Sequence, residues 1–167
     1  SRCGSTLVSQ MLAQIDSHQV FSEPPFLDQI FGAQASDRDK KKALESVFHI
    51  LGYYAKANQR SIWVKLDSWA IVYYNILRDV FPEVPFLFLI REPSEVVRSH
   101  RKIRGAQMVP GLLKSNPLQI RDVPVYDLDL YTEKVLISIL NNMMERVNDP
   151  RTYVLDYRFL NSRLSSC

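Results

Sequence analysis

The chain has 167 residues, the length of one ordinary domain; 46% of them are hydrophobic and 23% are charged. This composition excludes a disordered, collagen-like or low-complexity protein and provides enough apolar residues for a packed core. The net charge of +3 is too small to indicate a nucleic-acid partner, but it suits a small anionic ligand if the positive side chains converge. Two cysteines, Cys3 and Cys167, exclude a disulfide framework and an all-cysteine zinc site, and three scattered histidines do not suggest a metal centre.

Apolar, β-rich runs alternate with longer helical patterns, which is typical of an α/β domain with a parallel sheet. Strands are predicted at His18–Ser22, Ser61–Lys65, Phe86–Ile90 and Thr152–Leu155. The third, FLFLI, lacks polar alternation, so we expect it to be buried on both faces. Helices are predicted over residues 6–15, 39–57, 68–80, 93–102 and 131–147. No apolar run approaches the roughly 20 residues of a membrane span.

Residues 105–129 contain several prolines and are predicted to form a long irregular loop. Such loops in α/β enzymes are often lids or substrate walls. We expect this loop, together with residues 26–42, to form the walls of a substrate site. The side chains of the two segments mix apolar groups with Arg and Lys and do not identify the substrate.

The first candidate anion site is the segment SRCGSTLVSQML, which starts at Ser1 and places Arg2, Gly4 and Thr6 before an amphipathic helix. Its backbone N–H groups can curl around one anion, and the helix N-terminus adds a partial positive charge. An ordinary capped helix start with a nearby arginine explains the same residues. The Walker A pattern is absent, and with it the usual lysine and magnesium-binding hydroxyl.

The second candidate anion site follows the strand FLFLI, where Arg91 comes immediately after Ile90. Ligands of open α/β sheets bind at the carboxyl ends of strands, and the planar guanidinium group matches phosphate geometry. Ser99, on the helix that starts at Pro93, can approach the same phosphate from another direction. Alternatively, Arg91 pairs with neighbouring carboxylates and Ser99 is an ordinary surface residue.

Three segments, in this order, resemble sulfotransferases that use 3'-phosphoadenosine 5'-phosphosulfate (PAPS). SRCGSTLVSQML resembles their 5'-phosphosulfate loop, and Arg91-Glu92-Pro93 with Ser99 eight residues after the arginine resembles their 3'-phosphate motif. TYVLDYRFL is similar to their late strand and following helix. The resemblance covers most of the chain. With SEPPFLD, KLDSW and GAQMVPG, the sequence looks closest to a little-characterised, mostly bacterial sulfotransferase-like branch.

The resemblance implies a three-layer α/β sandwich with a parallel sheet and P-loop nucleotide-hydrolase-like topology. It implies PAPS as the co-substrate and no metal. Arg91 and Ser99 would hold the 3'-phosphate of PAPS. The 5'-phosphosulfate would be held by the backbone and side chains of Arg2, Cys3, Gly4, Ser5 and Thr6.

Two features depart from the family pattern. Arg2 stands where many cytosolic members have lysine; members that act on sugars or protein tyrosines more often have arginine. The strand before the loop and the family's C-terminal loop over the nucleotide are not found in the sequence. We therefore expect residues 1–167 to be a single sulfotransferase-like domain that is truncated at both ends, lacks its first strand and is poorly stable when expressed alone.

Glu23 is the candidate catalytic base, because sulfuryl transfer requires the acceptor to lose a proton. It follows the strand His18–Ser22 and precedes Pro24, which disfavours a helical conformation at Glu23. Glutamate-using members of the family carry their base in a similar place. An exposed loop carboxylate is the alternative interpretation. His18 is a rival base, but it starts the strand and should point toward the opposite end of the sheet.

Lys65 is the second candidate catalytic residue, because it ends the strand Ser61–Lys65 at the same predicted edge. An ammonium group there can stabilise the bridging oxygen of the leaving group. Asp67 is expected at most to orient Lys65, and Ser68 either caps the next helix or donates to the nucleotide. His100 is expected on the surface of its helix.

Cys3 lies in the loop, where Arg2 and a helix N-terminus are expected to lower the pKa of its thiol. The phosphatase pattern Cys-x₅-Arg is nevertheless absent, because the residue six positions after Cys3 is Ser9. A nucleophilic cysteine is therefore disfavoured.

The sequence thus predicts a metal-independent enzyme that transfers a sulfuryl group from PAPS to a hydroxyl or amine. The alternatives are a non-catalytic nucleotide-binding module of the same fold and a P-loop small-molecule kinase. The nucleotide sulfate donor and an unidentified acceptor are the expected partners, with no nucleic acid, no membrane segment and no prediction of oligomeric state. Sparse cysteine favours a cytoplasmic location, and a luminal Golgi-type catalytic domain is the alternative.

Overall fold

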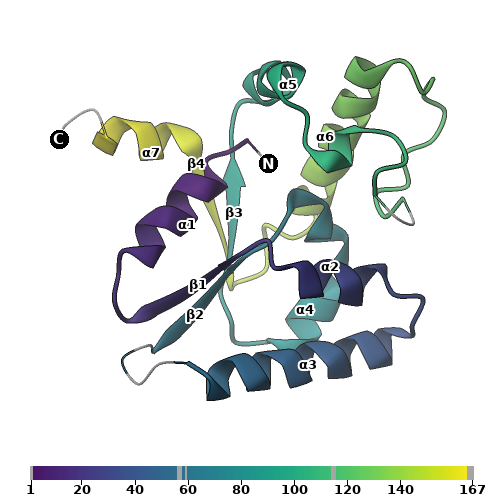
Figure 1. Ribbon diagram of the computed structural model, residues 1–167. Coiled ribbons are helices and arrows are strands. Elements are labelled where there is room, and N and C mark those ends of the chain that lie inside the picture. Colours follow the sequence, from purple (N-terminus) through teal and green to yellow (C-terminus); the bar gives the residue numbers. More distant parts are fainter. Residues whose placement is uncertain (1, 56–57, 59, 114–115, 165–167) are drawn as a thin grey trace. The chain divides into compact units, whose positions relative to one another are not determined.

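The computed structural model describes residues 2–55, 58, 60–113 and 116–164, with the side chains up to residue 160. Ser1, Cys167 and the end of the helix predicted over residues 39–57 lie outside these residues. The chain is an α/β protein in which helices outweigh short parallel sheets (Figure 1). No helix of the described part combines the length and apolar character that a membrane crossing needs.

The elements follow one another as the alternating sequence pattern predicts. In chain order they are α1 (Ser5–Ala13), β1 (His18–Ser22), α2 (Pro25–Gly32), α3 (Asp37–Tyr53), β2 (Ser61–Lys65), the 3₁₀ helix η1 (Ser68–Tyr73), α4 (Tyr74–Val80), β3 (Phe86–Ile90), α5 (Pro93–Lys102), the 3₁₀ helix η2 (Ala106–Met108), α6 (Leu128–Met144), β4 (Thr152–Asp156) and α7 (Tyr157–Leu164).

The predicted strands are confirmed: three have the predicted bounds, and β4 is one residue longer. The helix over 93–102 is also confirmed, whereas the others shift by a few residues at their ends. The helix predicted over 68–80 consists of η1 followed by α4. Helix α2 has no counterpart among the predicted helices, and it starts at Pro25, since proline fits the first turn of a helix.

The strands pair two by two instead of forming one sheet. β1 is parallel to β2 with Ser22 opposite Lys65, and β3 is parallel to β4 with Ile90 opposite Asp156. The expectation that β3 is buried on both faces is wrong, since the side chain of Leu87 is 43% exposed. The two faces of a strand are covered by elements that pack on the sheet, and the packing on β3 leaves Leu87 partly exposed.

The chain divides into two compact units, one made of residues 1–4 with 83–167 and the other of residues 5–82. We call them the β3–β4 unit and the β1–β2 unit. The prediction of a single domain over residues 1–167 stays a prediction. In the β3–β4 unit the core lies between α5 and α6, where Val96, Val135 and Ile139 are buried. In the β1–β2 unit, Phe31 stacks on Tyr73 with 4.5 Å between ring centroids.

Candidate functional site

The segment Arg2–Gly4 is tied by hydrogen bonds to both ends of α5. The carbonyl oxygen of Arg2 accepts from Nη1 of Arg91 at 3.3 Å. The guanidinium of Arg2 donates through Nη2 to the carbonyl oxygen of Ile103 at 2.8 Å. Arg2 has a φ of 64°, which is uncommon for a residue other than glycine and is found where the surroundings enforce it. The first predicted anion segment therefore meets the second one at Arg91.

Gly4 fits where a side chain would not. Its φ is 84°, and a Cβ atom there would lie 2.7 Å from Cδ2 of Tyr157. Tyr157 begins α7, directly after β4. The backbone of the loop consequently lies against a ring at the carboxyl end of β4, where ligands of parallel sheets bind.

Cys3 belongs to the core and is not exposed to the candidate site. It packs with Val96 and Leu136. Burial raises the pKa of its thiol, and this effect outweighs the opposing charge of Arg91. The expectation that Arg2 and a helix terminus would lower the pKa of Cys3 is therefore wrong, since desolvation of a thiolate costs more than a nearby charge returns. Cys3 contributes backbone to the loop.

Arg91 holds several groups together at the end of β3. Its Nε donates to Oε2 of Glu95 at 2.7 Å, and its guanidinium lies 4.5 Å from the centre of the Tyr157 ring. A flat, cationic group stacks well on an aromatic face. The alternative from the sequence, that Arg91 pairs with a neighbouring carboxylate, is confirmed. Glu95 accepts a hydrogen bond at one edge of the Arg91 guanidinium.

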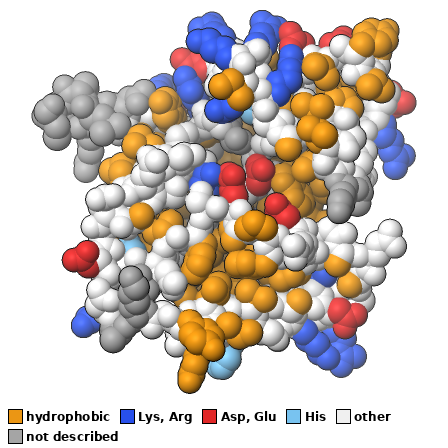
Figure 2. Space-filling model, viewed as in Figure 1, with side chains coloured by type: hydrophobic (Ala, Val, Ile, Leu, Met, Phe, Trp, Pro, Cys, Tyr) orange, Lys and Arg blue, Asp and Glu red, His pale blue; other side chains and the backbone are white. Residues whose placement is uncertain are grey.

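Arg91 and Ser99 line one shallow hollow of about 160 Å³, together with Glu95, Arg98 and Lys102. The structure thus brings together the two residues that the sequence assigned to one phosphate. Lys and Arg side chains gather over α5 in the space-filling view (Figure 2). Arg98 and Lys102 were missed by sequence reasoning. Their helical spacing from Arg91 was a usable signal, because positions seven and eleven residues on return to nearly the same helix face.

Ser5 and Thr6 fall in the other unit, where they form the first turn of α1. Thr6 is exposed, and its carbonyl oxygen accepts from the hydroxyl of Ser9 at 2.9 Å. The first backbone N–H groups of a helix have no partner within the helix, so this turn can donate to an anion.

Glu23 and Lys65 form an ion pair at the carboxyl ends of β1 and β2. The backbone N–H of Glu23 also donates to the carbonyl oxygen of Lys65 at 2.8 Å, which continues the ladder one step beyond the strands. The Lys65 side chain is 11% exposed and that of Glu23 is 46% exposed, so the carboxylate faces solvent while the ammonium is covered. Glu23 has a φ of 51°, which is in the left-handed region and not in the extended region that a following proline favours.

Two further carboxylates lie near Glu23. Burial raises the pKa of Asp28, and the charges of Asp67 and Glu23 raise it further. Burial likewise raises the pKa of Asp67, although the N–H of Ser68 donates to its carboxylate at 2.7 Å and favours the charged form. Asp67 therefore acts as the N-cap of η1, while Lys65 pairs with Glu23.

The two histidines considered in the sequence lie in different surroundings. His18 starts β1, packs on Trp63 at 5.4 Å, and lies at the opposite end of that strand from Glu23. His100 is fully buried, so its expected surface position is wrong. Its Nδ1 accepts from the N–H of Gly105 at 3.3 Å. Burial, together with nearby positive charges that include Arg2 and Arg104, lowers the pKa of His100 to about 4.

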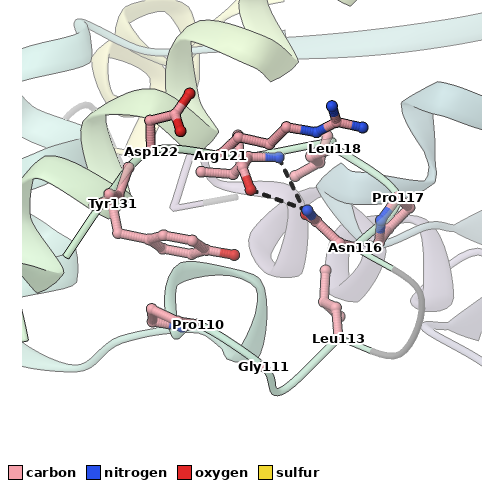
Figure 3. Close-up of a pocket in the computed structure, with 11 residues that line it drawn as sticks. Pro110, Gly111, Leu113, Asn116, Pro117, Leu118, Arg121, Asp122 and Tyr131 are labelled. Carbon is pink, nitrogen blue, oxygen red and sulfur yellow. Dashed lines mark hydrogen bonds between the residues drawn. The ribbon is translucent and has the colours of Figure 1, made fainter. Parts of the chain in front are cut away.

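The loop before α6 encloses a second cavity, of about 210 Å³ (Figure 3). Asn116 spans the loop by donating to the carbonyl oxygen of Ile120 and accepting from its N–H, at 2.9 and 3.1 Å. Tyr131 projects into the cavity, and the charged ends of Arg121 and Asp122 point away from its ring. Burial raises the pKa of Tyr131, so its phenol remains a donor at neutral pH.

No protein-family model matches the sequence, and a comparison with curated proteins also found no match. Within the described residues, no group of three or more His, Cys, Asp and Glu side chains is arranged to hold a metal ion. Conclusions about function therefore depend on the geometry and chemistry of the residues themselves.

Proposed function

We propose that the chain is a PAPS-dependent sulfotransferase that acts without a metal. The observation that carries the proposal is the convergence of Arg91 and Ser99 on one hollow, with Arg91 bonded to the backbone of the Arg2–Gly4 segment. The hollow is positively charged and lies beside the end of a parallel strand, which suits a phosphate. In the proposal Arg91 and Ser99 hold the 3'-phosphate, while residues 2–6 hold the 5'-phosphosulfate.

Glu23 and Lys65 carry the transfer step. The acceptor hydroxyl or amine attacks sulfur while Glu23 takes its proton, and the bond from sulfur to the bridging oxygen breaks. The products are the sulfated acceptor and adenosine 3',5'-bisphosphate, whose 5'-phosphate keeps the bond electrons. Lys65 stabilises the charge that develops on the bridging oxygen. The ion pair between the two side chains supports this assignment, because it holds a base and a cation together at a strand end.

The proposal includes a P-loop-like topology, in which the carboxyl ends of parallel strands carry the donor site. Both strand pairs are parallel, and the proposed catalytic and phosphate-binding residues follow or end strands, which supports this arrangement. The loop before α6 is the proposed wall of the acceptor site, and the cavity that it lines is where the acceptor would bind. The apolar side chains in its lining and the phenol of Tyr131 suit an acceptor with an apolar body and a polar group.

Titration calorimetry with adenosine 3',5'-bisphosphate and with ADP, without and with magnesium, tests the donor site. We expect metal-independent binding that favours the bisphosphate. A magnesium-dependent preference for ADP would instead identify a kinase. Binding of the bisphosphate without sulfation of any member of a panel of phenols, amines and sugars, assayed with radiolabelled PAPS, would identify a non-catalytic module.

Arg91→Ala tests the 3'-phosphate assignment directly. We expect affinity for the bisphosphate to fall about tenfold or more, since hydrogen bonds to charged groups contribute about 1.5–3 kcal/mol. Affinity for adenosine 5'-monophosphate should fall much less. Arg91→Lys is the comparison variant, because it keeps the charge but loses the planar fork. Equal losses for both nucleotides in Arg91→Ala would contradict the assignment.

A further inference from the structure

One face of the β3–α5 connection collects charges at helical spacing. Arg91 precedes α5, and Glu95, Arg98 and Lys102 follow at intervals of four, three and four residues. Such intervals place side chains in one stripe along a helix. All four line the hollow, and Ser99 lies beside them. The three positive side chains and one carboxylate leave the stripe with a net charge of +2.

The positive charges of this stripe are poorly compensated compared with others nearby. In the described part of the chain, neither Arg98 nor Lys102 has an ion-pair partner. Arg101 lies on the same helix and pairs through Nε with Asp129 at 3.0 Å, and Arg104 pairs with the same carboxylate. Of the cations that line the hollow, Arg91 is paired with Glu95, whereas Arg98 and Lys102 have no ion-pair partner among the described residues.

Glu95 forms an ion pair with Arg91. Its Oε2 accepts from Nε of Arg91, and the two side chains are 46% and 25% exposed. An ion pair this accessible to water contributes little to stability. An arriving dianion that contacts Arg91, Arg98 and Lys102 together offers more than this one carboxylate does, so Glu95 is displaced at small cost.

We propose that Arg98 and Lys102 are anion-binding residues that complete the hollow as a site for a terminal phosphate monoester, with Glu95 as the internal carboxylate that this phosphate displaces from Arg91. A monoester phosphate carries about two negative charges at pH 7, which matches the net charge of the stripe, whereas a diester carries one. The nucleotide identity of the ligand rests on the proposed function. The preference for a monoester rests on the hollow alone.

The test uses the full chain and two probes. Calorimetry with adenosine 3',5'-bisphosphate compares wild type with Arg98→Gln, Lys102→Met and Arg101→Gln, the last being a matched control on the same helix. We expect Arg98→Gln and Lys102→Met each to weaken binding about three- to tenfold and Arg101→Gln to change it less than twofold. Glu95→Gln should strengthen binding about two- to fivefold, because it removes the competing carboxylate. Arg98→Lys should restore most of the lost affinity.

The second probe does not involve a nucleotide. Backbone amide NMR shifts of α5 are followed with methyl phosphate and with dimethyl phosphate, and only the monoester should move the amides near Ser99 and Lys102. If methyl phosphate binds and the bisphosphate does not, the proposed function is contradicted and the monoester site is supported. If the bisphosphate binds through Arg91 while Arg98→Gln and Lys102→Met behave like Arg101→Gln, the inference is overturned and the function stands. Binding of neither probe overturns both.

Discussion

At the scale of single residues, the ion pair of Glu23 and Lys65 brings together two candidate residues that the sequence placed at the ends of different strands. Each was predicted separately, as the residue at the end of a strand. Parallel pairing with Ser22 opposite Lys65 then joins them, because it brings the two strand ends to the same level. The positive φ of Glu23 adds a local cost, which persists only where the surroundings enforce it.

Glu23→Gln should lower the rate of sulfation by about 10² to 10⁴, the usual contribution of a positioned base. Affinity for adenosine 3',5'-bisphosphate should stay within about twofold, since the amide keeps the shape of the side chain. The assay uses radiolabelled PAPS and any acceptor that the wild-type chain sulfates. Glu45→Gln, an exposed change on α3, is the control. An unchanged rate in Glu23→Gln would show that another group is the base.

His100 should make stability depend on mildly acidic pH. Its pKa is about 4 in the folded chain and near 6.5 when unfolded, so the unfolded state binds more protons between these values. The stabilisation is therefore complete above pH 6.5 and is lost as pH falls toward 4, by up to about 3 kcal/mol. Urea unfolding at pH 7 and pH 4.5 measures this loss.

His100→Asn serves as the comparison for this pH effect. The asparagine can keep an acceptor near the N–H of Gly105 but does not titrate. We expect a smaller drop in the free energy of unfolding between the two pH values than in wild type. Equal drops in both proteins would show that groups other than His100 account for the pH dependence.

At the scale of elements, the loop segment Arg2–Gly4 depends on close packing against α7. Gly4→Ala places a methyl group at 2.7 Å from Tyr157 and forces a non-glycine residue to a φ of 84°. The backbone strain alone is about 1–2 kcal/mol, and the clash adds to it. Thermal or urea unfolding should show a loss larger than this strain.

Gly32→Ala is the matched control for the Gly4 substitution. Gly32 ends α2, and nothing lies within 4 Å of the position its Cβ would take. Alanine is the better helix former, so we expect this change to be neutral or stabilising by up to about 1 kcal/mol. If both alanine variants had the same stability, the close approach of Gly4 to Tyr157 would not matter in solution.

The side chain of Asn116 stabilises the loop before α6. Removing this side chain should make the wall of the cavity less rigid. Asn116→Ala deletes two hydrogen bonds to Ile120, each contributing about 1 kcal/mol, at a residue whose φ is 40°. We expect limited proteolysis to cut within residues 105–127 several times faster. The control is Asn141→Ala, an exposed change on α6, and the protease should cut this variant at the wild-type rate. Equal rates in both variants would contradict this role of Asn116.

At the scale of the whole molecule, the short sheets point to modest stability. Each sheet has two strands, and a strand pair needs further packing to be stable in water. A ligand that binds only the folded chain adds RT ln(1 + [L]/Kd), about 2.7 kcal/mol at a hundredfold excess over Kd. Thermal unfolding with adenosine 3',5'-bisphosphate should therefore shift upward, and ADP at the same concentration should shift it less. Equal shifts would contradict recognition of the 3'-phosphate.

The sequence by itself determined the strands and the positions of the candidate residues at their ends. Hydrophobic runs and helical spacing report on neighbours a few residues away, and this is enough to locate β1, β2 and β3 at their bounds. It also placed Arg91 and Ser99 close together, since both belong to one strand-to-helix connection, and both line one hollow.

The tertiary structure alone decided which residues are buried and which strands pair. The raised pKa of Cys3 depends on its burial against Val96 and Leu136, which are far from it in the sequence, and the burial of His100 was likewise not evident from its neighbours in the sequence. The pairing of the strands two by two likewise depends on contacts between segments that are far apart in the sequence. Desolvation and charge compensation depend on everything packed around a group, so they cannot be read from its sequence neighbours.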